Sequence, residues 1–289
     1  MELDRRNFFR MIGATGISLV VGKEMKAAPD LSNNSEFKGV LYDASRCKGC
    51  LGCEIDCADA NGLPSPPSKK EIKGLRKPDE KWRTVVNGHE TSKGKVYAKL
   101  QCMHCNEPAC AAACLTQAMY KTTEGPVIWR EDKCMGCRYC MISCPFDMPK
   151  FEYHSPIPII QKCTMCFETR VQQGEIPACV ENCPNEALAF GTRRELIQEA
   201  RKRIVENPEL YYDHIYGEHE AGGTCWMYIS PVPFEELGMN TRVQNESYPA
   251  LTKGFLYTVP SVFVLIPALL LGVQQATTNN QLNKENEDE

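Results

Sequence analysis

Short apolar runs recur along the middle of the chain, and each one leads into a cluster of cysteines. The pattern occurs four times between about residues 36 and 250, and a cysteine follows each run within a few residues. The runs comprise residues 39–42, 96–100, 126–129 and 156–160. Their length and apolar character predict short strands, and the prolines in the fourth run make it the weakest candidate. The repetition indicates duplicated structural units.

Other segments of the middle region also predict local structure. Residues 119–129 predict a hairpin around a Gly-Pro turn, and residues 224–229 predict a strand. Residues 192–195 form a capping box, which predicts the start of a helix. The apolar face of that helix comprises Leu196, Ile197, Ala200 and Ile204. The Pro-, Lys- and Gly-rich stretch at residues 59–95 predicts a surface loop.

The first 29 residues have the pattern of an export signal. Arg5 and Arg6 precede two phenylalanines and a mildly apolar run, residues 11–21, which is too short to span a bilayer. This order is typical of a twin-arginine signal, and a basic amphipathic N-terminus of a cytoplasmic protein is the alternative. Cleavage near Ala28 and retention of the signal both stay open, because the small-residue pattern there is imperfect.

Residues 254–273 predict a C-terminal transmembrane anchor. The stretch has no charged residue, and at about 1.5 Å per residue a helix of this length reaches roughly 30 Å, the thickness of a hydrocarbon core. Pro260 and Pro267 would kink it. A buried core helix is the alternative, but the polar tail at residues 274–289 leaves nothing to bury it. With the export signal, the anchor predicts a periplasmic body on the cytoplasmic membrane.

The charge balance excludes some functions. The chain of 289 residues has a net charge of −4 and a pI near 5.9, so there is no electrostatic case for binding nucleic acid. We find no Gly-rich nucleotide fingerprint and no nucleophile–base pair. The sequence therefore gives no sign of bond-making chemistry by this chain itself.

Seventeen cysteines are far more than an average chain of this length contains. Sixteen of them form four groups of four. The groups are Cys47, Cys50, Cys53 and Cys57; Cys102, Cys105, Cys110 and Cys114; Cys134, Cys137, Cys140 and Cys144; and Cys163, Cys166, Cys179 and Cys183. The first and third follow the C-x2-C-x2-C-x3-C spacing of bacterial ferredoxins, and the others lengthen the middle gap.

This spacing predicts four [4Fe–4S] clusters held by the sixteen cysteines. Two residues between thiolates let a tight loop wrap one cube and aim its backbone N–H groups at sulfur, while the fourth cysteine ligates the partner cube. Disulfides and zinc are the alternatives. A disulfide scaffold has no reason to repeat this spacing four times, and three close cysteines suit a cube better than a zinc ion. Twin-arginine export fits too, because clusters can be inserted before a folded protein is exported.

Further residues near the cysteines are candidates for secondary roles. Nearby cations would raise a cluster's reduction potential, and an ordinary solvated surface is the alternative for them. The basic candidates are Arg46, Lys48, Lys133, Arg138, Lys162 and Arg170. Cys225 lies in an apolar run and predicts a buried structural thiol. His104 lies between two cysteines, where packing or a hydrogen bond near a cluster is favoured over ligation.

The chain resembles the four-cluster ferredoxin-like subunits of membrane-bound respiratory oxidoreductases. It is most similar to the electron-transfer subunit of Hyb-type uptake nickel–iron hydrogenases. The matching stretches are GVLYD at 39–43, QCMHC at 101–105, CRYC at 137–140, Pro149-Lys150, GTRRE at 191–195 and GGT at 222–224. Both an export signal and an anchor are typical of the hydrogenase type. Leu115 departs from the proline that is usual after the second group.

The resemblance implies an exchange of cysteines between the groups. The first group would exchange its last cysteine with the fourth group, and the second with the third. One cube would bind Cys47, Cys50, Cys53 and Cys183, and the next Cys163, Cys166, Cys179 and Cys57. A third would bind Cys102, Cys105, Cys110 and Cys144, and the fourth Cys134, Cys137, Cys140 and Cys114.

The resemblance also implies the fold, the partners and the role. We expect an α+β fold of two ferredoxin-like dicluster modules over residues 36–250, with a single C-terminal transmembrane helix. Electrons would pass from the small and large subunits of a periplasmic hydrogenase to a quinone-reactive, NrfD-like integral membrane subunit. The equivalent subunit of a molybdenum formate dehydrogenase or sulfur-compound reductase is the second hypothesis. A soluble ferredoxin shuttle is the third, and the anchor argues against it.

Overall fold

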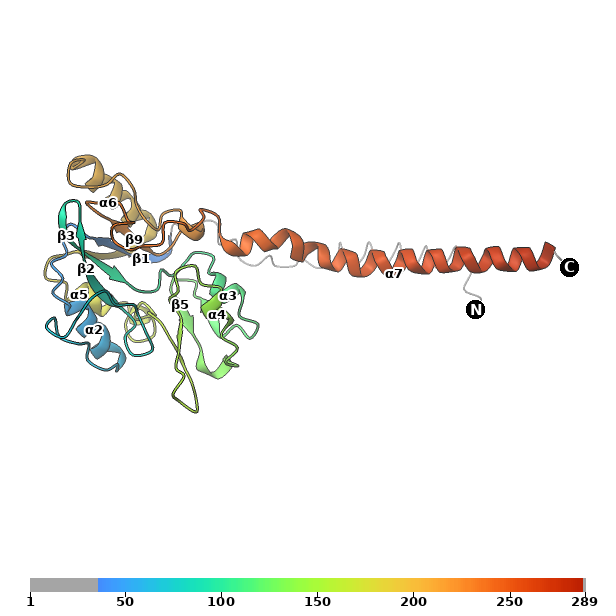
Figure 1. Ribbon diagram of the computed structural model, residues 1–289, viewed down its shortest axis with the longest axis horizontal. Helices are drawn as coiled ribbons and strands as arrows, with labels where there is room; N and C mark the ends of the chain where they lie inside the picture. Colours follow the sequence, from blue (N-terminus) through green and yellow to red (C-terminus); the bar gives the residue numbers. More distant parts are fainter. Residues whose placement is uncertain (1–35, 288–289) are drawn as a thin grey trace. The chain divides into compact units, whose positions relative to one another are not determined.

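The computed structural model describes residues 36–287, and Figure 1 shows its helices and strands. The strands are β1 (Lys38–Asp43), β2 (Val85–Thr91), β3 (Gly94–Leu100), β4 (Met119–Lys121), β5 (Val127–Trp129), β6 (Lys150–Phe151), β7 (Ile160–Gln161), β8 (Leu188–Thr192) and β9 (Trp226–Ile229). The helices are α2 (Gly52–Asn61), α3 (Ala109–Ala112), α4 (Tyr139–Ile142), α5 (Ala178–Glu181), α6 (Arg193–Glu206) and α7 (Tyr248–Glu287). The predicted signal at residues 1–29 lies outside the described residues and stays a prediction.

A small mixed sheet ties the two ends of the cysteine-rich region together. Its strand order is β8-β1-β9, with β1 antiparallel to β8 and parallel to β9. The middle of β1 is completely buried, as its apolar sequence predicts. Gly39 in β1 allows close approach of the backbone, because a Cβ atom there would lie 2.5 Å from the Cys225 carbonyl oxygen. Residues near 40, 190 and 228 thus form one scaffold.

Helix α6 covers one side of this sheet. Thr192 caps its N-terminus, and the reciprocal hydrogen bonds with Glu195 complete the predicted capping box. Leu196, Ala200 and Ile204 are buried against Leu41, Met227 and Ile229 of the sheet, and Ile197 is partly buried. The prediction of this helix and of its apolar face is therefore confirmed.

The second half of the cysteine region is built around short hairpins and single helical turns. Strands β4 and β5 pair as predicted, and α3 and α4 pack beside them around a shared apolar core. The prediction for residues 156–160 is largely wrong, since only Ile160 enters a strand and pairs with Phe151 of β6. Pro156 and Pro158 explain this, because neither can donate a ladder hydrogen bond.

The stretch at residues 59–95 is more ordered than the sequence predicts. Val85–Thr91 forms β2, which pairs with β3 along its whole length, and Val85 and Val86 are buried. Arg76 reaches back from the same stretch to Glu54 of α2. Composition predicts a loop here because Pro, Lys and Gly dominate the first part of the segment. The strand at its end is too short to change that average composition.

Helix α7 contains the predicted anchor. Its segment Tyr248–Gln275 is long and apolar enough to cross a membrane, and none of that segment is buried against the rest of the protein. The helix continues through Pro260 and Pro267. The alternative of a buried core helix is therefore wrong, and the fold is α+β with a single apolar C-terminal helix that could span a membrane.

Candidate functional site

The structure gathers sixteen cysteines into four sets, and all seventeen cysteines are free thiols. Set A comprises Cys47, Cys50, Cys53 and Cys183. Set B comprises Cys57, Cys163, Cys166 and Cys179. Set C comprises Cys102, Cys105, Cys110 and Cys144. Set D comprises Cys114, Cys134, Cys137 and Cys140. These are the four sets that the family resemblance implies.

Set A lines a cavity of about 370 Å³ at the start of α2. Burial raises the pKa of the Cys47 thiol, and Cys50 and Cys183 raise it further, so residues far apart in the sequence meet here. Gly49 N–H donates to Cys47 Sγ at 3.4 Å. A side chain at position 49 is excluded, since a Cβ atom would lie 2.2 Å from the ring of Tyr97. The loop therefore turns tightly around the cavity.

Set B lines a second cavity, of about 310 Å³, further along α2. Cys53 of set A and Cys57 of set B are one helical turn apart on α2, so this helix is a wall shared by both sets. Burial raises the pKa of the Cys57 thiol to about 12, and neighbouring thiols contribute. Cys179 reaches the site from α5, which packs against α2.

Sets C and D occupy the other half of the cysteine region. Burial raises the pKa of the Cys105 thiol well above its usual value, and the other three thiols of set C raise it further. Burial likewise raises the pKa of Cys140 to about 11, and the other three thiols of set D add to this. Helices α3 and α4 pack together and carry Cys110 and Cys140.

The backbone repeats itself around the first pair of cysteines in each group. The residue two positions after the leading cysteine has a positive φ in every group. These residues are Gly49, His104, Gly136 and Met165. A left-handed conformation costs a non-glycine residue about 1–2 kcal/mol, and the Met165 N–H donates to Cys163 Sγ at 3.3 Å in return. The units that the sequence predicts as duplicated therefore share one backbone conformation at this position. At Gly49 and Met165 the backbone N–H donates to the sulfur of the leading cysteine.

The four sets follow one another in the order A, B, C, D. Burial is the largest cause of the raised pKa of Cys179, Cys163 and Cys110, and a thiol of the neighbouring set raises each one further. The cross-set pairs are Cys53–Cys179, Cys102–Cys163 and Cys110–Cys140. Of the sixteen thiols, only Cys50 in set A and Cys137 in set D are exposed. Each terminal set therefore has one exposed cysteine, set B is wholly buried, and set C has two half-buried cysteines, Cys105 and Cys144.

Two buried lysines lie along this row. Lys99 of β3 is 1% exposed, and its pKa is lowered by burial but raised more strongly by thiols of sets A and B. Lys162 is 3% exposed, donates to the Val127 and Cys163 carbonyl oxygens, and lies near Cys110 and Cys144 of set C. Lys162 is among the basic candidates predicted from the sequence and Lys99 is not, because a lysine in a strand ordinarily faces solvent.

The other basic candidates are engaged elsewhere. Arg46 pairs with Asp43 at 3.4 Å, and Arg170 pairs with Glu175 at 3.2 Å. Arg138 lies 5.4 Å from the ring centre of Phe151. Lys48 contributes to the lining of the set A cavity, and neither Lys48 nor Lys133 forms a salt bridge within the described residues. Solvated or locally paired charges therefore account for most of this group.

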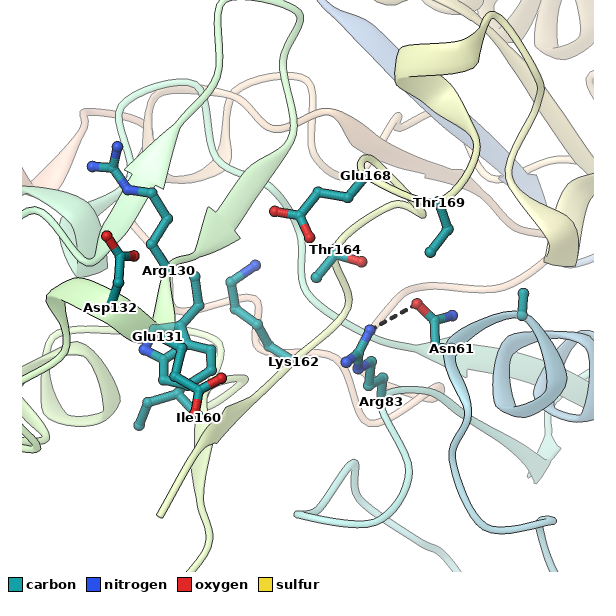
Figure 2. A pocket seen from close by; sticks show the side chains of 12 residues that line it. Asn61, Arg83, Arg130, Glu131, Asp132, Ile160, Lys162, Thr164, Glu168 and Thr169 are labelled. Carbon is teal, nitrogen blue, oxygen red and sulfur yellow. Dashed lines mark hydrogen bonds between the residues drawn. The ribbon is translucent and has the colours of Figure 1, made fainter. Parts of the chain in front are cut away.

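A wide groove of about 1400 Å³ beside set B has no cysteine in its lining (Figure 2). Arg83 crosses its floor, donating to Asn61 Oδ1 at 2.8 Å and to Gln161 Oε1 at 2.8 Å. The first of these bonds turns the Asn61 amide nitrogen toward Cys57 Sγ and Cys166 Sγ, each at 3.8 Å. The groove therefore supplies a chain of side chains that orients a donor toward set B.

Cys225 and His104 have the structural surroundings that the sequence predicts. Cys225 is completely buried, with the Lys121 amine 3.3 Å from its Sγ. His104 is also completely buried, and its Nδ1 accepts the Val127 N–H at 2.8 Å, so Nε2 carries the proton. Within residues 36–287, no group of three His, Cys, Asp or Glu side chains is arranged to hold a single metal ion.

Buried polar groups at the cavities fit an anionic sulfur-rich occupant. Lys99 has no carboxylate partner within 4.0 Å in the described part of the chain. The Trp226 indole N–H, in the lining of the set B cavity, has no hydrogen-bond acceptor among the described residues. Buried cations and donors without partners are rare in proteins, and iron-bound thiolates and sulfides would satisfy both. The donor sets therefore fit iron–sulfur clusters.

The α+β fold and the cysteine sets define an iron–sulfur electron-transfer protein. Residues 95–193 match the model of the 4Fe-4S dicluster domain family. Over 97% of both chains, the sequence is 31% identical to the hydrogenase-2 operon protein HybA of Escherichia coli O157:H7. It is 42% identical to a protein of Nitratidesulfovibrio vulgaris over 96% of this chain and 78% of the relative. It is 32% identical to the formate dehydrogenase iron-sulfur subunit of Haemophilus influenzae over 70% of this chain and 67% of the relative.

The chain belongs to the family of HybA-like iron–sulfur subunits, which also includes the formate dehydrogenase subunits. The resemblance stated from the sequence motifs is confirmed. The chain is accordingly an electron-transfer subunit of an oxidoreductase complex.

Proposed function

We propose that the chain holds four [4Fe–4S] clusters, one on each of the sets A to D. All sixteen cysteines of these sets are the ligands in this proposal. Cavities lined by four cysteines support it for sets A and B, and mutual proximity of the thiols supports it for sets C and D. When bound, such clusters accept and release single electrons. The chain's own residues hold the clusters, shield set B from water, and supply N–H donors to sulfur.

The row of sets is a path for electrons between two partner proteins. The observation that carries this proposal is that the exposed thiols, Cys50 and Cys137, belong to the two terminal sets. An electron can therefore enter at one end and leave at the other, while neither inner set has an exposed cysteine. The chain itself makes and breaks no bonds in this proposal, and the complex is the enzyme.

The set D end faces the membrane partner. Helix α7 contacts α3, which carries Cys110 of set C, and Ser247 donates to Glu107 just before α3. Exposed apolar side chains surround the set D cysteines in the sequence. This apolar patch comprises Leu115, Met135, Tyr139 and Ile142, which are 55–81% exposed. A quinone-reactive integral membrane subunit of the NrfD-like class suits such a surface, and set A then faces the catalytic partner.

We infer that the catalytic partner is a periplasmic nickel–iron hydrogenase. The support is the relative whose printed name belongs to a hydrogenase operon, which matches over nearly its whole length. The formate dehydrogenase subunits match over a smaller share of this chain, as does the probable anaerobic dimethyl sulfoxide reductase chain of Escherichia coli K12. A molybdenum enzyme is therefore the alternative partner. The twin-arginine pattern supports export and a position on the periplasmic side, with α7 as the anchor.

An anaerobic pull-down of the tagged chain from solubilised membranes tests this assignment. Nickel in the captured complex, together with hydrogen-dependent dye reduction, is the expected result. Molybdenum or tungsten without nickel would move the chain to the formate dehydrogenase or sulfur-compound reductase class and leave the clusters in place. Total iron in the purified chain tests the clusters separately, because four cubes require about sixteen iron atoms per chain.

A further inference from the structure

Lys99 is the most enclosed cation of the described residues, and no carboxylate compensates its charge. Its side chain is 1% exposed, and the amine donates to the Thr84 hydroxyl, which in turn donates to the Leu100 carbonyl oxygen at 3.2 Å. The Trp226 ring centre lies 5.2 Å from Nζ. The amine is thus fixed in place by Thr84, just before β2, and by Trp226 of β9, so its partners are a hydroxyl and an aromatic face.

The position of Lys99 relates it to two sets of cysteines at once. It lines the set B cavity together with Cys57, Cys163 and Cys179, and it also interacts with Cys53 of set A. A buried ammonium group is unfavourable unless an anion lies nearby. The thiolate-bound clusters of the proposed function carry net negative charge and would be that anion.

We propose that Lys99 is a redox-positioning residue, whose buried ammonium group raises the reduction potentials of the clusters on sets A and B together. This inference rests on the proposed function. A fixed cation stabilises the reduced, more negative state of a neighbouring cluster more than its oxidised state. The effect is strong because little water screens the charge at this depth. Set C lies beside Lys162 instead, so Lys99 acts on the half of the row that contains sets A and B.

The test is an EPR-monitored redox titration of the full chain in its complex, comparing wild type with Lys99→Met. Methionine keeps most of the length of lysine and removes the charge. At a fixed potential, the oxidised-to-reduced ratio of two clusters should rise about tenfold, which is about 59 mV for a one-electron couple. The other two clusters should keep their wild-type ratios. Parallel titration of Cys50→Ser identifies the signal of set A.

Lys95→Met is the matched control. Lys95 lies on the same strand, is about half exposed and pairs with Glu90 at 3.6 Å, so the same loss of charge should leave all ratios unchanged. A Lys99→Met protein with full iron and unchanged ratios would overturn the inference. So would a shift of all four clusters by the same factor, because that would report a general change in packing.

Two further variants decide the matter if Lys99→Met does not hold its clusters. Iron retained in Lys99→Arg but lost from Lys99→Gln would support the requirement for a charge. Loss in all three variants would show that packing is what matters at this position, and would overturn the inference. The proposed function fails separately, since that failure would appear as missing iron in the wild-type chain.

Discussion

Replacing Arg76 with methionine should release the helix that carries cysteines of both set A and set B. Arg76 donates to the Glu54 carboxylate at 2.9 and 2.5 Å, and the Val86 N–H donates to the same carboxylate at 2.6 Å. Glu54 lies on α2 between Cys53 and Cys57 and is completely enclosed, with a side chain 1% exposed. The pair therefore pins α2 to the β2–β3 hairpin.

The size of the effect follows from the burial of the two partners. Removing one partner of a buried ion pair costs about 3–5 kcal/mol, because the remaining charge is left without compensation. The Arg76 side chain is 16% exposed, so water can enter when it is removed, and the lower value of about 3 kcal/mol is the better expectation. That energy corresponds to a roughly 100-fold larger population of the locally opened state.

The assay is the rate at which a chelator removes iron from the anaerobic protein in moderate urea. If opening around α2 limits this loss, the clusters of sets A and B should bleach about 100-fold faster, and those of sets C and D should follow the wild-type rate. Lys77→Met is the control, because Lys77 belongs to an exposed pair with Asp147 at 3.9 Å, which contributes little.

The double variant Arg76→Met with Glu54→Gln separates charge from packing. A glutamine can still accept the Val86 N–H and leaves no buried charge without a partner. The double variant should therefore regain much of the local stability around α2 that Arg76→Met loses, and its iron should be removed more slowly. Wild-type bleaching rates in Arg76→Met would refute the reasoning. An equal acceleration of all four clusters would refute the local part of it, because opening would then involve the whole cysteine region.

Four other outcomes are expected. Cys50→Ser should lower the iron content by about one cluster, or about four atoms, whereas Cys225→Ser should retain all of it; full iron in Cys50→Ser would remove that residue from the ligands. Deleting residues 254–273 should leave the iron content intact and move the protein from the membrane to the soluble fraction, and unchanged retention would contradict the anchor. Ile142→Glu should reduce co-purification of the membrane subunit, while Val205→Glu, which is equally exposed on α6, should not. Thr192→Ala should lower the free energy of unfolding by about 1 kcal/mol. The Thr192 side chain and its backbone N–H both lower the pKa of Glu195, and alanine keeps the N–H, so the variant should lose part of the stability that the wild type gains as the pH rises through the acidic range.

Local signals carried most of what the sequence predicts correctly. A capping box fixes the start of α6, a Gly-Pro turn fixes the β4–β5 hairpin, and an uncharged run of helical length fixes the core of α7. Each depends on neighbours within a few residues, and so does the cysteine spacing. The spacing also predicts the tight loops around the leading cysteines, which the positive φ values at His104 and Met165 bear out.

The features that the sequence does not predict depend on packing between distant segments. Lys99 belongs to an apolar run. Its side chain is buried because Trp226, from a distant part of the chain, packs against it, and the local sequence does not predict that contact. Strand β2 follows a stretch whose composition is that of a loop, and its pairing with β3 defines it. The grouping of cysteines came from the family resemblance, since spacing along the chain does not choose between the possible exchanges.

The arrangement of the sets along the chain has a consequence for biogenesis. Sets C and D draw all their cysteines from residues 102–144, whereas sets A and B each combine cysteines from before residue 58 with others from after residue 162. The cysteines of sets C and D thus lie between the two groups of cysteines that make up sets A and B. As the chain leaves the ribosome, the inner pair has all of its cysteines while the outer pair still lacks four of its eight. Metal loading can therefore proceed from the inside outward, and a chain truncated near residue 160 would carry the inner half alone.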